Sequence, residues 1–322
     1  MPKAAIEKFR NDLFSEVIER ANRYLTDLPN RPVSPAPGAV AGLERLNLPL
    51  QDQPMDPVAV LAELDDIGSS ATVASAGHRY FGFVTGGALP ATLAANMLAA
   101  AWDQNAVLET ASPVAAFIEE VCRKWLVSLL RLPPPTAVGF ATGATMANFT
   151  GLAAARHALL EQQGWDVESR GLFGAPAIEV ITGEEVHVSV LKALSMLGLG
   201  RDRVVKVPTD EQGRMRADSL PAIDGPTIIC IQAGNVNTGA FDPAAEICIN
   251  AREKGPGSMS MAPSACGPPP RPPNRRWPKA LKTPIPGPQM PTNGSTCPMT
   301  AVWYLCAMCA ICWRPCQAMR PT

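Results

Sequence analysis

The sequence predicts an α/β protein with a mainly parallel sheet, because strand-like and helix-like segments alternate between residues 138 and 254. Short apolar runs rich in valine and isoleucine are followed, after a polar or glycine-containing turn, by segments with helical spacing. A parallel sheet covered by helices is the usual structure for such a repeat, and its ligands bind at the carboxyl ends of the strands. Functional residues are therefore expected in the loops that follow the strands.

The repeat consists of four strand–helix pairs. The expected strands are residues 138–141, 178–182, 204–207 and 227–232, and the expected helices are residues 146–163, 188–197, 215–222 and 243–254. The last strand contains the apolar run 228–231, as is typical of a strand that is buried on both faces.

The amino-terminal part, residues 1–80, is expected to be a helical segment with a linker. A proline-rich connection occupies residues 28–37. Asp56-Pro57 predicts a helix start in this part, and Ser112-Pro113 predicts another one further along the chain, because aspartate and serine cap helices and proline fits the first turn. The first helix is expected to be amphipathic, with apolar residues at near-helical spacing: Ile6, Phe9, Leu13, Val17, Tyr24 and Leu25.

Charge and hydropathy argue against several classes of function. The formal net charge is −1, so no overall basic character indicates a nucleic-acid or anionic-membrane partner. The first residues lack the apolar run of a signal peptide, and no segment reaches the roughly 20 apolar residues of a membrane-spanning helix. The sequence therefore predicts a soluble cytoplasmic protein with no nucleic-acid and no membrane partner.

The composition changes abruptly near residue 255. All 29 acidic residues of the chain lie in residues 1–255, and residues 256–322 contain none. The same final segment holds 15 of the 33 prolines and 6 of the 9 cysteines. A folded enzyme domain seldom changes composition so sharply, so residues 256–322 are interpreted as an aberrant segment.

The first candidate loop is Thr142-Gly143-Ala144-Thr145-Met146-Ala147-Asn148, between a predicted strand and a predicted helix. Small residues let backbone N–H groups approach an anion, and the helix N-terminus adds its positive dipole end. The hydroxyl of Thr145 is a further donor. The alternative is an ordinary strand-to-helix turn capped by threonine. The segment is neither a Walker loop nor the dinucleotide-binding fingerprint.

Two more candidate loops follow the next strands. In Gly183-Glu184-Glu185-Val186-His187-Val188-Ser189, the histidine stands at a strand end, where its ring could lie flat on a bound cofactor or serve as a capping or packing group. The segment from Gln232 to Asp242 gathers amides and a hydroxyl at another strand end, and a solvent loop rich in turn formers is its alternative.

Together the three loops resemble those of the group II decarboxylases that depend on pyridoxal 5′-phosphate (PLP), a family that includes glutamate and aromatic amino-acid decarboxylases. The resemblance covers roughly residues 40–255 and rests on the order of the motifs. It implies the large domain of a fold-type I PLP enzyme, PLP as the cofactor and loss of the α-carboxylate from an amino-acid substrate. It also implies a homodimer, because the family's amino-terminal helical segment commonly packs across a dimer partner.

The resemblance implies roles for the residues at the cofactor. The family's Gly-Ala-Thr turn binds the cofactor phosphate, and here it corresponds to Gly143, Ala144 and Thr145. Its Glu-x-x-His motif places a histidine on the pyridine ring, which corresponds to His187. Its Gly-Asn-Val-Asn-Thr-Gly segment lies beside the cofactor, and the residues implied there are Asn235 and Thr238.

The substrate side is implied by an earlier segment. Tyr-Phe-Gly-Phe-Val-Thr, which ends at Thr85, resembles the family's substrate-pocket strand. His78 begins the same aromatic, glycine-bearing stretch, for which pocket lining and a core-packing loop are both open. The third histidine, His157, is expected on the surface of a helix.

Two residues that PLP chemistry needs do not appear where the family places them. A carboxylate that keeps the pyridine nitrogen protonated belongs in a His-Val-Asp-Gly-Ala motif just after the helix ending near residue 254. A lysine that carries PLP as a Schiff base belongs in an Asp-Ala-His-Lys-Trp motif about thirty residues later. Lys279 and Lys282 stand in other contexts. His187 is then the one catalytic candidate, and the chain is expected to be inactive or nearly so.

A frameshift near codon 255 explains the aberrant segment. When the last base of each codon is joined to the first two bases of the next, residues 257–264 are compatible with Val-His-Val-Asp-Gly-Ala-Phe. In the same frame, residues 289–294 are compatible with Asp-Ala-His-Lys-Trp. Both missing motifs appear in the right order and at about the right spacing. Residues 256–322 are therefore predicted to be out of frame and disordered.

Four cysteines in this segment offer another interpretation. Their C-x2-C-x2-C-x3-C spacing is typical of iron–sulfur ligands, and a zinc site is a weaker version of the same idea. Gln317 stands where the iron–sulfur motif has proline, and no second cluster motif accompanies it. Under the frameshift the spacing is accidental, so no metal site is predicted at Cys306, Cys309, Cys312 and Cys316.

The predicted organisation is a helical segment and linker over residues 1–80, a partial PLP-binding large domain over 81–255 and the aberrant segment over 256–322. Another fold-type I PLP enzyme (an aminotransferase or a carbon–carbon lyase) and a non-catalytic pseudoenzyme remain as alternatives. The sequence does not identify the amino acid that would be decarboxylated.

Overall fold

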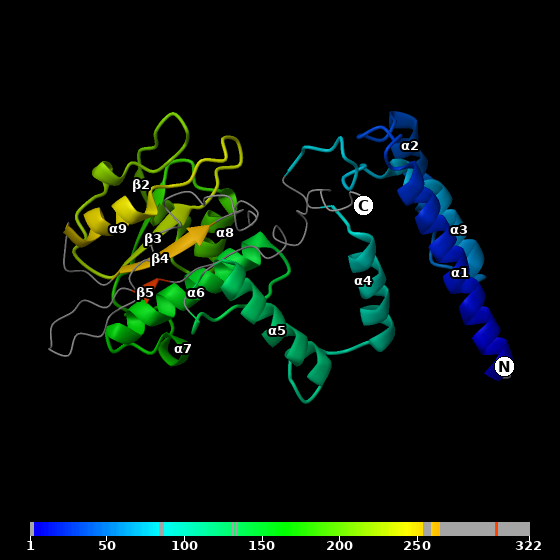
Figure 1. The fold of residues 1–322 in the computed structure, drawn as a ribbon, viewed down its shortest axis with the longest axis horizontal. Helices are drawn as coiled ribbons and strands as arrows, with labels where there is room; N and C mark the ends of the chain where they lie inside the picture. Colours follow the sequence, from blue (N-terminus) through cyan, green and yellow to red (C-terminus); the bar gives the residue numbers. More distant parts are fainter. Residues whose placement is uncertain are drawn as a thin grey trace, which may run out of the picture. The chain divides into compact units, whose positions relative to one another are not determined.

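The computed structural model describes residues 3–83, 87–130, 132, 134–253, 259–264 and 300–301. The chain forms two compact units, Met1–Asn96 and Met97–Thr322, whose boundary falls within helix α4 (Pro90–Trp102). The first unit is helical and the second contains the sheet (Figure 1). None of the helices described has the length and apolar character needed to cross a membrane.

The first unit is built on two helices in contact, α1 (Lys3–Asp27) and α3 (Pro57–Gly68). Arg20 of α1 lies 3.1 Å from the carboxylate of Asp65 and 2.8 Å from that of Asp66, both on α3. The first predicted helix is confirmed. The connection between α1 and α3 contains α2 (Pro37–Gly42) and a 3-10 turn (Leu43–Leu46), and a second 3-10 turn (Ser69–Ala71) follows α3.

Both helix starts that the sequence predicts are confirmed. At the start of α3, Asp56 accepts a hydrogen bond from the N–H of Val58 at 3.4 Å. At the start of α5 (Pro113–Leu129), Ser112 accepts one from the N–H of Ala115 at 3.4 Å, and Ser112 is fully buried. A proline occupies the first position of each helix, where its missing N–H costs no hydrogen bond.

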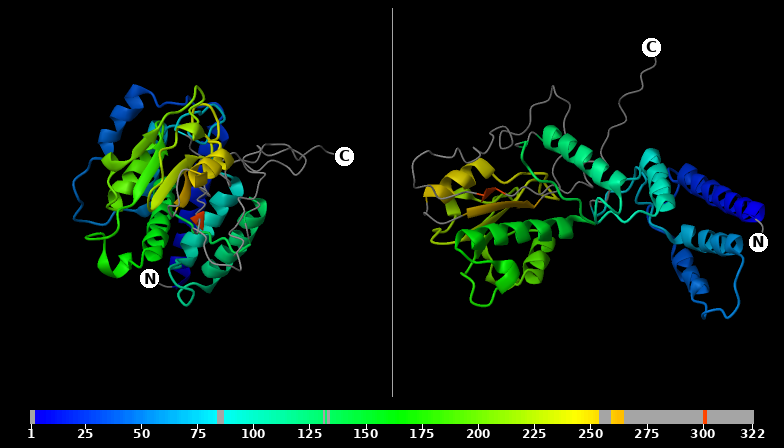
Figure 2. Two further views of the ribbon diagram at one scale, coloured as in Figure 1. Left: turned by 90° about the vertical axis from the view of Figure 1, so that its left-hand side faces the viewer. Right: turned by 90° about the horizontal axis from the view of Figure 1, so that it is seen from below.

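The second unit contains a parallel sheet (Figure 2). In the described residues the strand order is β2-β1-β3-β4-β5, and every neighbouring pair is parallel. The predicted α/β class with a mainly parallel sheet is therefore confirmed. The strands are β1 (Glu179–Gly183), β2 (Val205–Val207), β3 (Thr227–Gln232), β4 (Met259–Ser264) and β5 (Thr300–Ala301).

Helices cover both faces of this sheet (Figure 2). Helix α9 (Ala244–Glu253) packs on one face, and α6 (Ala144–Gln162) and α8 (Val188–Met196) pack on the other. The short helix α7 (Val167–Arg170) follows α6, and 3-10 turns occupy Arg201–Arg203 and Ala217–Ser219.

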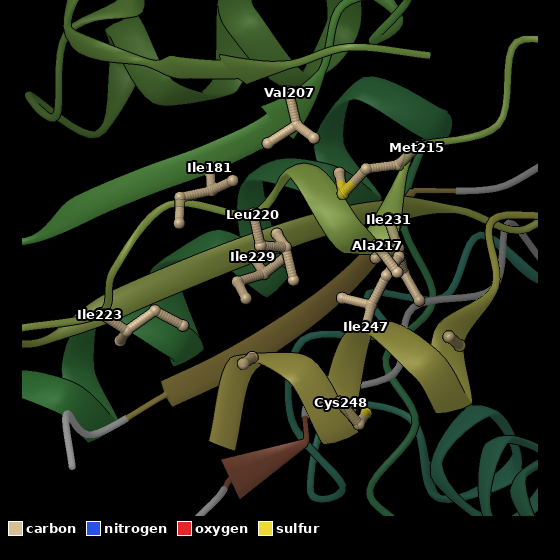
Figure 3. Packing of buried hydrophobic residues seen from close by; sticks show 12 residues of the cluster. Ile181, Val207, Met215, Ala217, Leu220, Ile223, Ile229, Ile231, Ile247 and Cys248 are labelled. Atoms are coloured by element: carbon tan, nitrogen blue, oxygen red, sulfur yellow. The ribbon is translucent and has the colours of Figure 1, made fainter. Parts of the chain in front are cut away.

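Strand β3 supplies side chains to two separate hydrophobic clusters. Ile229 and Ile231 pack with Ile247 of α9 on one face (Figure 3). Ile228 and Cys230 point to the other face, where Leu194 of α8 belongs to the same cluster. Complete burial of such an aliphatic side chain stabilises the fold by about 1.5–3 kcal/mol. Both faces of the strand are thus held by packing.

Two predicted elements are wrong. Residues 138–141 form no strand, because none of the described strands runs beside them to pair with their backbone. Residues 215–222 form only the 3-10 turn Ala217–Ser219, because Met215 instead makes an antiparallel bridge with Thr209. The other predicted strands and helices are found, with ends that differ by at most two residues.

Strands β4 and β5 belong to residues 256–322, for which the sequence predicts an out-of-frame and disordered segment. The backbone of β4 pairs with β3 along the full length of both strands, from Thr227↔Met259 to Gln232↔Ser264. Strand β5 pairs with β4 at two positions. The run that the shifted frame converts to Val-His-Val-Asp-Gly-Ala-Phe therefore includes a strand beside β3.

Candidate functional site

The candidate residues of the second unit follow the carboxyl ends of its strands or begin its helices. Because the strands are parallel, the loops after β1 and β3 leave the sheet at the same edge. These loops contain His187, Asn235 and Thr238, whereas Thr145 lies in the first turn of α6. Hydrogen bonds link several of these segments.

The turn before α6 is open to an anion. No side chain caps α6 at Gly143, so its first N–H groups lack the partner that a cap supplies. A Cβ atom added to Gly143 would meet no heavy atom within 4 Å. The backbone of Gly143 is extended, with φ 171° and ψ 173°, so conformation alone does not require glycine there. Thr145 is half-buried in the first turn of the helix.

His187 caps the start of α8, and its ring is exposed. Its Nδ1 accepts a hydrogen bond from the N–H of Ser189 at 3.2 Å and lies 2.7 Å from the hydroxyl of the same serine. Asn148 of α6 donates to that hydroxyl at 2.9 Å. The helix that begins with Ala144 and Thr145 is therefore joined to His187 through one serine.

Asn235 holds the loop after β3. Its Oδ1 accepts hydrogen bonds from the N–H groups of Asn237 at 2.9 Å and Thr238 at 3.3 Å. Its Nδ2 donates to the carboxylate of Glu185 at 3.1 Å, and the residue is 6% exposed. Both ends of this amide are thus used within the protein, and the bond to Glu185 joins the loops after β1 and β3.

Thr238 is exposed at the tip of this loop. Its hydroxyl donates to the carbonyl of Gln212 at 2.8 Å and accepts from the N–H of Ala240 at 3.2 Å. The adjacent Gly213 has φ +70°, and a Cβ atom there would run into the side chains of Glu185 and Asn235. Glycine is therefore needed at this position for both its backbone conformation and the space it leaves.

Asp242 anchors the end of the loop that follows β3. Its carboxylate accepts hydrogen bonds from the N–H groups of Met215 at 2.8 Å and Gln232 at 2.6 Å. The side chain is buried, and burial raises the pKa of this carboxyl above its ordinary value. One carboxylate thus ties the end of β3 to the segment that follows β2.

Neither substrate-side candidate belongs to the described residues of the second unit. His78 is exposed and belongs to the first unit, where its neighbour Arg79 donates to the carbonyls of Pro29 at 3.0 Å and Arg31 at 2.6 Å. Thr85 lies outside the described residues.

No group of three or more histidine, cysteine, aspartate or glutamate residues suited to a metal ion occurs in the part of the chain that the structure describes. The cysteines of the iron–sulfur interpretation (Cys306, Cys309, Cys312 and Cys316) lie outside that part.

Sequence reasoning assigned no role to several residues that build this edge. Asn148 and Ser189 stand within the quoted loops, but the bond between them joins residues 41 positions apart. A serine two residues after a histidine at a helix start is a local signal that could have found half of this contact. The contacts of Glu185, Gly213 and Asp242 depend on the fold.

A family model described as the pyridoxal-dependent decarboxylase conserved domain matches residues 43–255. Among curated proteins, an acidic amino acid decarboxylase of Homo sapiens is 28% identical over 177 residues, which are 52% of this chain and 33% of that protein. The cysteine sulfinic acid decarboxylase of Rattus norvegicus is 28% identical over 257 residues, covering 76% and 50%. The L-2,4-diaminobutyrate decarboxylase of Rhizobium meliloti is 32% identical over 168 residues, covering 50% and 32%. The matches thus span half of these relatives or less.

Solved structures agree on the fold. The crystal structure of mouse CSAD matches with a TM-score of 0.66 and 24% identity, over 81% of this chain and 55% of that one. The structure of Oryza sativa TDC with PLP and tryptamine matches with a TM-score of 0.64 and 20% identity, over 81% and 56%. At such identities the likeness shows the fold, and the predicted fold of the PLP-dependent decarboxylases is confirmed.

Proposed function

Because the chain belongs to the pyridoxal-dependent decarboxylase family, we propose that residues 43–255 are the cofactor-binding part of an amino-acid carboxy-lyase. The reaction is loss of the α-carboxylate from an amino acid, with PLP, the cofactor of the family. The observation that carries the proposal is the joined edge of the second unit, where Asn148 and Ser189 connect the open start of α6 to the exposed ring of His187.

The residues at this edge fit PLP. The phosphate is an anion, and the uncapped N-terminus of a 19-residue helix with open space at Gly143 is suited to hold one. We assign the phosphate to Gly143, Ala144 and Thr145, with the hydroxyl of Thr145 as an additional donor. The pyridine ring is flat and apolar on its faces, and the exposed ring of His187 supplies a flat surface of the same kind.

Asn235 and Thr238 complete the cofactor side of the site in this proposal. Their polar groups already bond within the loop and to Glu185 and Gln212, so their contribution is to fix the loop's shape. On the substrate side, the proposal retains His78 and Thr85 as pocket residues.

When bound, PLP accepts the electron pair left behind as CO2 departs. The part of this chain is to position the reacting groups. Residues that hold the cofactor in one orientation would therefore serve the reaction. Thr145 would hold the phosphate of the cofactor, and the ring of His187 would limit the movement of its pyridine ring.

We further propose that the 322-residue chain as printed cannot complete this reaction, because a frameshift near codon 255 removes the carboxylate and the lysine. The family match ends at residue 255, two residues after the last acidic residue of the chain, Glu253. The domain proposal follows: residues 1–80 are a helical segment and linker, 81–255 a partial large domain and 256–322 out-of-frame sequence.

The reading frame is testable directly. Sequencing of the coding DNA through codons 250–260, with the intact mass of the natively expressed protein, shows whether the printed tail is made. A variant with the frame restored at codon 255 is expected to take up PLP covalently and to release CO2 from an amino acid, whereas the printed chain does neither. A restored variant that folds but shows neither property would refute the frameshift proposal.

Cofactor binding by the printed chain is tested by equilibrium dialysis against PLP. Thr145→Ala removes a charge-assisted hydrogen bond, worth about 1.5–3 kcal/mol, and should raise the Kd roughly 10- to 160-fold. Thr150→Ala, on the same helix, is the control, because the hydroxyl of Thr150 bonds to the carbonyl of Met146 and belongs to no proposed contact. Equal affinity of the two variants would remove the phosphate assignment.

A homodimer is proposed on the exposed apolar side of α5. Val114, Phe117, Ile118 and Trp125 follow helical spacing there, and Phe117 and Trp125 are 72% and 69% exposed. Light scattering tests the proposal: Trp125→Glu should lower the mass to that of a monomer, and Lys124→Glu, whose side chain is 65% exposed, should not. A monomeric parent chain would contradict it. A cytoplasmic location is proposed on the free thiols of Cys122 and Cys230, because thiols stay reduced in that compartment.

A further inference from the structure

His187 stands at the end of a row of hydrogen bonds that begins on α6. Asn148 donates its Nδ2 to the hydroxyl of Ser189, and that hydroxyl lies against Nδ1 of His187. Ser189 is 4% exposed, so solvent has little access to this contact. The other ring nitrogen, Nε2, is on the exposed side chain, away from these bonds.

The backbone of Ser189 determines where the ring carries its proton. A peptide N–H can only donate, so Nδ1 must offer its lone pair to the N–H of Ser189. The hydroxyl of Ser189 accepts from Asn148 and keeps its own proton to donate to the same nitrogen. A neutral His187 with both contacts therefore carries its proton on Nε2.

We propose that Ser189 and Asn148 are positioning residues that fix His187 as the Nε2–H tautomer. The exposed side of the ring then presents a hydrogen-bond donor to the bound ligand, and the two contacts at Nδ1 hold the ring in one orientation. The ligand's identity rests on the proposed function, but the tautomer is a property of the chain without cofactor. The two ideas can therefore fail separately.

The tautomer is measured by nuclear magnetic resonance on the printed chain labelled with 15N-histidine, without PLP. The chain has 3 histidines, so His78→Gln and His157→Gln assign the signals of His187 by difference. The expected spectrum shows Nδ1 without a proton and Nε2 with one, as a single tautomer. Exposed His78 serves as an internal reference for a ring in exchange between tautomers. An Nδ1–H signal for His187, or an averaged signal like that of His78, overturns the proposal.

Variants of Ser189 and Asn148 show whether these residues position the ring of His187 or only support the fold. In Ser189→Ala, one of two donors to Nδ1 is lost, so the Nδ1 signal should move toward that of His78. In Asn148→Asp, the serine proton turns to the new carboxylate, which favours a proton on Nδ1 and should move the signal further. Ser189→Thr keeps the hydroxyl and should restore the parent spectrum. Ser195→Ala, on the same helix, is the control, because that hydroxyl bonds to the carbonyl of Leu191.

The outcome is decisive even if a variant unfolds, because the parent spectrum alone establishes or refutes the tautomer. A Ser189→Ala spectrum equal to that of the parent also overturns the positioning role. The same samples are then titrated with PLP. A parent chain with the expected tautomer and no PLP binding counts against the proposed function and leaves the tautomer assignment standing.

Discussion

Replacement of Asp242 by alanine tests how much of the sheet edge depends on one buried carboxylate. The side chain is 5% exposed and receives the N–H groups of Met215 and Gln232. Alanine leaves both N–H groups without this partner, at about 1–3 kcal/mol each. Removal of a buried charge offsets part of this cost, so the lower part of the range, about 2–4 kcal/mol in total, is expected.

The assay is thermal unfolding followed by circular dichroism. In a domain of this size 1 kcal/mol lowers Tm by about 2–4 °C, so Asp242→Ala should melt roughly 4–16 °C lower than the parent. Asp218→Ala is the control, because its side chain is 67% exposed and a surface change of this kind stays within about 0.5 kcal/mol. If the two variants melt at the same temperature, the carboxylate does not hold the edge.

The raised pKa of Asp242 also predicts how the stability of the protein changes with pH. Burial raises the pKa of Asp242 above 3.8, so the folded state binds its proton more tightly than the unfolded state. The contribution of this proton binding to the free energy of unfolding is fully present below pH 3.8, and it is lost as the pH rises through the raised pKa of Asp242. The difference in Tm between the parent and Asp242→Ala should therefore widen as the pH falls toward 3.8. A difference that narrows over this range would contradict the stated effect of burial.

Three further predictions concern the same unit. Gly213→Ala should lower the free energy of unfolding by about 2–4 kcal/mol in denaturant, because it adds backbone strain and displaces Glu185 from Asn235. Gly164→Ala has the same φ of +70° but open space around it, so it should cost only about 1–2 kcal/mol. Equal losses would show that the Glu185–Asn235 contact does not contribute. Leu194→Ala, in a fully buried position, should lower the free energy of unfolding by about 2–5 kcal/mol. Met196→Ala, at 59% exposure, should change it little. A small loss of stability at Leu194 would mean that the cluster collapses around the alanine. Burial raises the pKa of Cys230 to about 12, so iodoacetamide at neutral pH should label Cys122 well before Cys230 in peptide maps of the native chain, and labelling at equal rates would contradict this burial.

Much of the fold could be predicted because its signals are local. Strand β3 was predicted with the ends that the structure gives, since its apolar residues 228–231 stand between the turn formers Pro226 and Gly234. The caps Asp56 and Ser112 each predict the start of a helix from no more than four consecutive residues. By contrast, residues 138–141 have a strand's composition, but a strand exists only beside a partner, and composition does not supply one.

The candidate site was predictable as a set of loops but not as a set of contacts. The order of strands and helices identifies the segments that contain His187 and Asn235. The bonds from Asn148 to Ser189 and from Asn235 to Glu185 join positions 41 and 50 residues apart, so they depend on how the sheet brings its loops together. The role of Asp242 as an anchor was missed for the same reason.

The alternation of side chains along β3 also limits how this gene can change. Ile229 and Ile231 serve one hydrophobic cluster, and Ile228 and Cys230 serve the other. Insertion or deletion of one codon within Thr227–Gln232 would exchange the two sets and mismatch both clusters at once. Heritable variation in β3 is therefore expected to proceed by substitution of one apolar residue for another, and its length is expected to be among the most constant features of related sequences.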